Sequence, residues 1–225
     1  MDSVSLKHIE NSKLQILSMS VLCIVTFLTA IFALGLGSSI NLDFFNTMKI
    51  VFGLDSGDDM QSAIIWELRF PRILMAIIGG AALAIAGSLM QGCLGNPLVS
   101  PLTLGVASGA ALGAALAIVL GFSIISNSDL AIVANAFLFS LIVVGVIIQL
   151  GNFRSVSAES YILVGIAITF LAGAIVSTMQ YFATDAQLSQ LAHWSFGSLS
   201  RPTLENTLWI TVALVGLIPS ALKKA

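Results

Sequence analysis

Two arginines that flank a proline are the first residues in this sequence whose type and spacing suggest chemistry. Arg69, Pro71 and Arg72 stand immediately before a long apolar run. Two guanidinium groups three residues apart are well suited to bind carboxylates on a protein partner, and proline is tolerated in the first turn of a helix. The alternative is that both side chains extend to lipid phosphates at the end of a membrane helix. The residues alone leave both interpretations open.

A cluster of turn-forming residues interrupts the apolar sequence further on. Gly95, Asn96, Pro97, Leu98 and Pro101 lie between two apolar runs. Glycine, asparagine and proline together are typical of a tight turn. An apolar leucine beside an asparagine could also close a pore at this point, and the spacing does not decide between the two.

A third pattern places hydroxyl groups on one stripe of a predicted helix. Gly165, Thr169, Gly173 and Ser177 recur every four residues, and the stripe continues to Tyr181. Such a stripe could line a weakly polar path through the membrane. The hydroxyls could equally donate hydrogen bonds to carbonyls of their own helix.

Catalytic and metal-binding signatures are missing from the sequence. Its two histidines, His8 and His193, belong to no zinc-protease, nucleophile-elbow or phosphate-loop motif. Cys23 and Cys93 form neither a C-x-x-C pair nor a disulfide framework. We therefore predict a protein that is not an enzyme and that needs no cofactor and no metal.

The composition indicates an integral membrane protein. Of the 225 residues, 57% are hydrophobic and 9% are charged, and the mean hydropathy is +1.02, whereas about a quarter of the residues of a soluble domain are charged. Residues 73–128 contain no Asp, Glu, Lys or Arg, as expected where each charge in hydrocarbon costs roughly 3 kcal/mol. The net charge of −2 gives no reason to expect nucleic acid as a partner.

Long uninterrupted apolar runs favour helices over barrel strands, which are short and alternate apolar with polar residues. We predict an all-α transmembrane bundle that forms one domain, residues 1–225. Ladders of small residues at Gly80, Ala84 and Ser88 and at Gly105, Gly109, Gly113 and Ala117 predict close helix packing. About six spans are expected: 14–36, 73–93, 103–121, 130–150, 161–183 and 204–222.

The segments between the spans give a weak signal for orientation. Five Lys or Arg residues against four favour a cytoplasmic N-terminus, so that residues 1–13 form a cytoplasmic tail and residues 37–68 a periplasmic segment. Within the latter, residues 42–54 are amphipathic and predict a short surface helix. Residues 184–202 are too polar to span the membrane and predict an outer half-helix, broken or re-entrant.

The motifs closely resemble a known family. R-F-P-R, G-G-A-A-L-A-I-A-G-S-L-M-Q and N-P-L-V-S-P-L-T-L-G-V-A-S-G-A-A-L-G are similar to the membrane permease subunits of bacterial ABC importers for iron-siderophore complexes, haem and cobalamin. I-L-V-G-I-A-I and H-W-S-F-G-S-L resemble that family's fifth span and outer half-helix. The resemblance covers about residues 60 to 222.

The resemblance implies roles for individual residues. Arg69 and Arg72 would form salt bridges with glutamates of a periplasmic substrate-binding protein. Asn96 and Leu98, with Glu159 and Ser160, would belong to the cytoplasmic gate. The stripe of Gly165, Thr169, Gly173 and Ser177 would line the translocation path. The implied partners are an ABC ATPase subunit, the binding protein, a second permease subunit in a homo- or heterodimer, and the lipid bilayer.

One departure from the family pattern concerns length. The family has ten spans and a coupling loop after the sixth, whereas this sequence ends at Ala225, where that loop would begin. Our leading hypothesis is a permease subunit in the bacterial inner membrane that imports a bulky metal chelate, a ferric siderophore before cobalamin or haem. The alternative expectation is a truncated, non-transporting paralogue or half of a split subunit.

Overall fold

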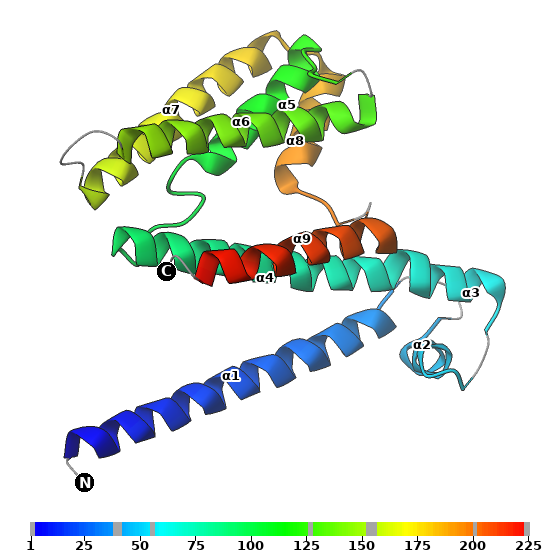
Figure 1. Cartoon of the computed structure of the whole chain (residues 1–225). Coiled ribbons are helices and arrows are strands. Elements are labelled where there is room, and N and C mark those ends of the chain that lie inside the picture. The colour runs from blue at the N-terminus through cyan, green and yellow to red at the C-terminus, as the bar shows by residue number, and fades with distance from the viewer. Residues whose placement is uncertain are drawn as a thin grey trace. The chain divides into compact units, whose positions relative to one another are not determined.

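A computed structural model describes residues 3–37, 42–54, 57–125, 128–151, 157–199 and 202–222. Every regular element in these residues is helical (Figure 1), which confirms the all-α prediction. The helices are α1 (Ser3–Gly35), α2 (Phe44–Val51), α3 (Asp59–Ala63), the π-helix η1 (Ile64–Arg69), α4 (Phe70–Leu94), α5 (Val106–Leu120), α6 (Ser128–Gly151), α7 (Ala158–Phe182), α8 (Asp185–Phe196) and α9 (Leu204–Leu222).

The chain divides into two compact units. The first comprises Met1–Ile78 and Leu199–Thr211, and the second comprises Gly79–Ser198 and Val212–Ala225. Helices α4 and α9 contribute residues to both units.

Four stretches of the described chain are long and apolar enough to cross a membrane. They are Ser12–Gly35, Asp59–Leu94, Leu130–Leu150 and Ala158–Phe182, and they confirm the first, second, fourth and fifth predicted spans. The prediction for 103–121 is wrong in length, because α5 has 15 residues and is about 22 Å long at 1.5 Å per residue. Left-handed glycines, Gly105 and Gly121, stand at its two ends. The last predicted span corresponds to α9, which has 19 residues.

The predicted surface helix in the segment before the second span is present as α2. Asp43 caps it, because its carboxylate accepts a hydrogen bond from the Asn46 backbone N–H at 3.0 Å. Ile50 of this helix packs into a small core with Leu42 and Ile65. In addition to this predicted surface helix, the segment before the second span contains α3 and the start of the π-helix η1.

The helical path into α4 begins earlier than expected, and this corrects the placement of Pro71 in a first helical turn. Helix α3, the π-helix and α4 follow one another without a break from Asp59 to Leu94. The π-turn brings the Phe70 N–H to the Ile65 carbonyl. Pro71 then lies inside a helical stretch, where it lacks an N–H, and a widened turn is a common way to accommodate this.

The second unit is a bundle in which α5 packs against α6, α7 and α8 (Figure 1). Gly109 and Gly113 lie so close to α6 that a Cβ at either position would clash with the backbone of Phe139 or Asn135. This confirms the packing predicted for that ladder. Helix α8, at the predicted half-helix, has 12 residues, and its Leu191 and Trp194 join Ala115 and Ile118 of α5 in one cluster.

Candidate functional site

Arg69 is engaged inside the first unit. Its Nη1 donates a hydrogen bond to the Leu34 carbonyl at 2.8 Å and a longer one to Thr47 Oγ1 at 3.4 Å. Leu34 lies in the last turn of α1 and Thr47 in the middle of α2, where it is completely buried. A side chain at Gly37 would collide with the guanidinium group. Arg69 therefore ties the end of α1 to α2.

The second arginine is placed differently. Arg72 is exposed, and no described residue forms an ion pair or hydrogen bond with its side chain. The two arginines are three positions apart, about 60° round a helix of 3.6 residues per turn, yet Arg69 is partly buried and Arg72 is not. The structure thus gives the predicted pair two separate environments.

The predicted gate turn is held mainly by local hydrogen bonds. Gly95 ends α4 in the left-handed conformation, with a φ of 59°. Asn96 Oδ1 accepts from the Leu98 N–H at 2.9 Å, which is an Asx turn. Gln91 reaches back from α4, and its Nε2 donates to the carbonyls of Pro97 at 3.1 Å and Val99 at 3.4 Å.

These bonds determine which side chains of the turn face inward. Val99 is fully buried, whereas Leu98 is 77% exposed. Ser100 and Thr103 then close the next turn reciprocally, because each backbone N–H donates to the other's hydroxyl oxygen. The sequence interpretation of a tight turn is confirmed, and the turn presents Leu98 on its surface.

Helix α7 contacts the backbone that follows this turn, at Thr103, Leu104 and Gly105. A Cβ at Gly165 would lie 2.5 Å from the Thr103 carbonyl oxygen and 2.7 Å from the Leu104 Cα, and one at Gly105 would lie 2.8 Å from the Gly165 oxygen. Gly165 is buried as a result. Two glycines therefore permit the backbone of the turn to pass directly over α7.

The rest of the predicted stripe on α7 changes character along the helix. Thr169 is half-buried and donates to the Gly165 carbonyl at 2.9 Å, the self-bonding alternative raised from the sequence. Gly173 and Ser177 are exposed in the described chain. The stripe thus begins as a packing contact and continues as an open face.

Glu159 and Ser160 lie in the first turn of α7. Glu159 is exposed and Ser160 half-buried, and the Ser160 hydroxyl lies 3.4 Å from that of Ser157, the N-cap residue. No interaction described in the structure joins Glu159 or Ser160 to Asn96 or Leu98. Their membership of one gate stays a prediction.

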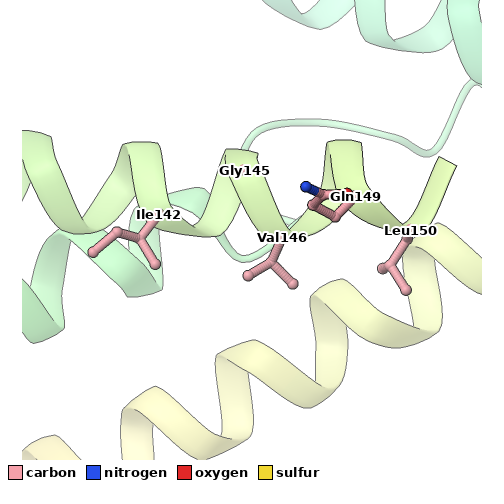
Figure 2. Close-up of a pocket in the computed structure, with 5 residues that line it drawn as sticks. All are labelled: Ile142, Gly145, Val146, Gln149 and Leu150. Carbon is pink, nitrogen blue, oxygen red and sulfur yellow. The ribbon is translucent and has the colours of Figure 1, made fainter. Parts of the chain in front are cut away.

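An apolar groove runs along α6 on the side of α7. Its volume is about 490 Å³, and the lining residues all belong to α6: Ile142, Gly145, Val146, Gln149 and Leu150. Figure 2 shows Ile142, Val146 and Leu150 directed toward the neighbouring helix. Gly145 also lines the groove and adds no side chain to it, and Gln149 is the polar residue of the lining.

Three polar residues with clear structural tasks escaped the sequence analysis. Asn135 is completely buried, donates from Nδ2 to the Phe122 carbonyl at 2.6 Å and accepts from the Ile124 N–H at 3.2 Å. Gln187 Nε2 donates to the Val119 carbonyl at 3.1 Å, which joins α8 to α5. Gln91 is the third. Their common signal is a single amide side chain in or beside an apolar run, where it must find a partner.

No group of three or more His, Cys, Asp or Glu residues gathers in a metal-binding arrangement within the part of the chain that the structure describes. Each unit therefore has its own candidate residue: the exposed Arg72 in the first unit and the exposed Leu98 on its braced turn in the second.

Comparison with known proteins identifies the family. The model of the FecCD transport family matches residues 22–224. The chain belongs to the FecCD transport family. This confirms the resemblance to ABC importer permeases, places the chain among multi-pass membrane transport proteins, and assigns it to a family of permeases and not of enzymes.

Relatives within the FecCD family are similar over most of this chain. A Methanocaldococcus jannaschii protein described as an ABC transporter permease is 37% identical over 212 residues, 89% of this chain and 58% of that protein. The hemin transport system permease HmuU of Yersinia pestis is 35% identical over 67% of this chain and 46% of its own length. The vitamin B12 permease BtuC of Vibrio cholerae is 37% identical over 63% and 42%.

A solved structure is similar in fold as well. It is described as an inward-facing conformation of a metal-chelate type ABC transporter, and it matches with a TM-score of 0.67 and 31% identity over 86% of this chain and 57% of that one. This FecCD chain spans about half the length of the curated relatives it matches.

Proposed function

We propose that this chain is the permease part of an ABC importer that moves a bulky metal chelate, a ferric siderophore, from a periplasmic binding protein into the cytoplasm. Relatives named for hemin and for vitamin B12 support a large chelate as substrate. The observation that carries the proposal is the braced turn between α4 and α5, which exposes Leu98 and holds the backbone around it by bonds from Asn96 and Gln91.

The proposed topology follows from this assignment. The chain lies in the bacterial inner membrane with a cytoplasmic N-terminus, so that Arg72 faces the periplasm and Leu98 the cytoplasm. Arg72 is exposed and available to a carboxylate of the binding protein. Asn96 and Leu98, with Glu159 and Ser160, form the cytoplasmic gate. An apolar side chain at such a constriction can close a path by excluding water.

The path itself is proposed to follow the exposed part of the α7 stripe. Gly173 and Ser177 present little bulk and one hydroxyl, which suits a large solute that forms few fixed contacts. Thr169 contributes a satisfied hydroxyl, and Gly165 lets the backbone of Thr103 and Leu104 approach α7 closely. An ABC ATPase subunit and a second permease subunit, identical or different, are the remaining proposed partners.

Transport by reconstituted vesicles tests this function. The full chain is reconstituted with its ATPase and binding protein, and uptake of a radioactive ferric siderophore is measured with ATP and with a non-hydrolysable analogue. We expect uptake only with ATP, and a Leu98→Gly variant that leaks substrate without ATP. Parallel measurements with haem and cobalamin decide the chelate. Absence of ATP-dependent uptake of all three would refute the transport proposal.

A further inference from the structure

Helix α2 presents an apolar face that the interior of the first unit does not use. Thr47 and Ile50 are buried on one side of the helix. Phe45 and Phe52, seven positions apart and therefore on the same side at 3.6 residues per turn, are 73% and 71% exposed. Leu54, just beyond the helix, is 79% exposed. Exposure of such apolar side chains to water is unfavourable.

The contacts of α2 show at which depth it lies. The apolar run that forms the first span ends at Leu36, so the last turn of α1 marks the edge of the hydrocarbon. The ring of Phe44 packs directly on Gly35 in that turn. Arg69 adds a second link, because it bonds the Leu34 carbonyl and Thr47 of α2. Helix α2 is thus held at the level where the first span leaves the membrane.

The rings of this region form a continuous series from the span to the exposed face. Phe32 of α1, 58% exposed, lies 6.3 Å from Phe44 between ring centroids, and Phe44 lies 5.9 Å from Phe45 in an edge-to-face arrangement. The apolar surface of the membrane helix therefore continues onto α2. Lys49, exposed on the same helix, adds a cation of the kind that pairs with lipid phosphate.

We propose that α2 is an interfacial helix, whose Phe45, Phe52 and Leu54 insert into the headgroup region of a phospholipid bilayer while Lys49 contacts phosphate. The buried side of the helix, through Thr47 and Ile50, holds this face at a constant angle. The occupant is lipid because the face extends the surface of a membrane span at the level of its last turn. Aromatic and cationic residues on a short amphipathic helix are suited to that layer.

Spin-label accessibility tests this inference and requires neither ATPase nor substrate, so its failure is separate from failure of the transport proposal. Single cysteines replace Phe45 or Phe52 in the full chain carrying Cys23→Ser and Cys93→Ser. Each is labelled with a nitroxide in vesicles of phosphatidylcholine and phosphatidylglycerol. Collision with oxygen, which concentrates in lipid, is compared with collision with a water-soluble nickel chelate.

The matched control is Asn46→Cys, one residue on and about 100° round the same helix. We expect the oxygen-to-nickel ratio at positions 45 and 52 to exceed that at 46 several-fold. Two positions are used so that one poorly folded variant does not decide the result. Equal nickel accessibility at all three positions would overturn the proposal, and so would nickel accessibility at 45 and 52 that disappears when a binding protein is added, since the face would then bind protein.

Discussion

The two ends of helix α4 are built in different ways. At the Arg69 end, one side chain bonds to residues that lie 35 and 22 positions away in the sequence. At the other end, the turn after Leu94 is braced by Gln91, Asn96, Ser100 and Thr103, whose hydrogen bonds reach at most eight positions. One end therefore depends on how distant helices meet, and the other on the local order of residues.

This difference explains why the two predicted arginines lie in different environments, whereas the predicted turn is present in the structure. A local turn is specified by residues that are already neighbours in the chain. A guanidinium group can bond any acceptor that the fold brings within reach, and here the Leu34 carbonyl in the last turn of α1 needed a donor. Single substitutions at the two ends of α4 test this contrast.

The largest effect is expected for Arg69→Ala. Loss of hydrogen bonds from a charged donor, with a buried hydroxyl at Thr47 left unpaired, should lower the free energy of unfolding by about 1.5–3 kcal/mol. Unfolding by SDS in mixed micelles, followed by the fluorescence of nearby Trp66, measures this. Arg69→Lys should restore part of the loss. If the Arg69→Ala protein is as stable as the unmodified chain, the bonds from Arg69 to Leu34 and Thr47 do not stabilise the fold, and the contrast between the two ends fails.

Gly165→Ala comes next and tests a non-local contact near the turn, at Thr103 and Leu104. The added methyl group would meet the backbone of Thr103 and Leu104, and overpacking of this kind costs about 1–3 kcal/mol. The same SDS titration measures the loss. Gly173→Ala on the same helix is the control, because no described atom lies within 4 Å of its added Cβ, and it should be neutral or slightly stabilising.

A smaller effect is expected for Gln91→Leu. The carbonyls of Pro97 and Val99 would lose their donor, which should cost about 1 kcal/mol and loosen the turn around Leu98. Limited proteolysis in the turn, in the same detergent, reports the loosening. Ser88→Ala is the matched change, since the Ser88 hydroxyl bonds only its own helix at the Ile85 carbonyl. Equal cleavage rates in the two variants would show that Gln91 does not brace the turn.

Arg72→Ala should hardly affect stability, within about 0.5 kcal/mol, because exposed substitutions rarely exceed that. Its effect should appear instead in association with the proposed binding protein, measured by surface plasmon resonance on nanodiscs at two salt concentrations. Weaker binding with unchanged stability would show that Arg72 acts in association, whereas Arg69 acts in stability. If stability falls as far as in Arg69→Ala, the two arginines share one structural role.

Several features could be predicted from the sequence because they depend on local order or on composition. Uncharged apolar runs determine membrane helices, since charge is costly in hydrocarbon. Gly95, Asn96 and Pro97 determine a turn, and glycines spaced by four allow close packing, as Gly109 and Gly113 confirm against α6. The length of α5 was overestimated because hydropathy does not register that the chain turns before Gly105.

Only the tertiary structure decided where the polar side chains of the apolar helices find partners. Thr169 bonds its own helix, Gln187 bonds α5, and Asn135 closes the segment around Phe122. Arg69, the residue that the sequence placed beside Arg72 as an equal, became a clamp between α1 and α2. The physical reason is that a polar group in apolar surroundings bonds the partners that the fold brings within reach, and the positions of those partners depend on how distant segments pack.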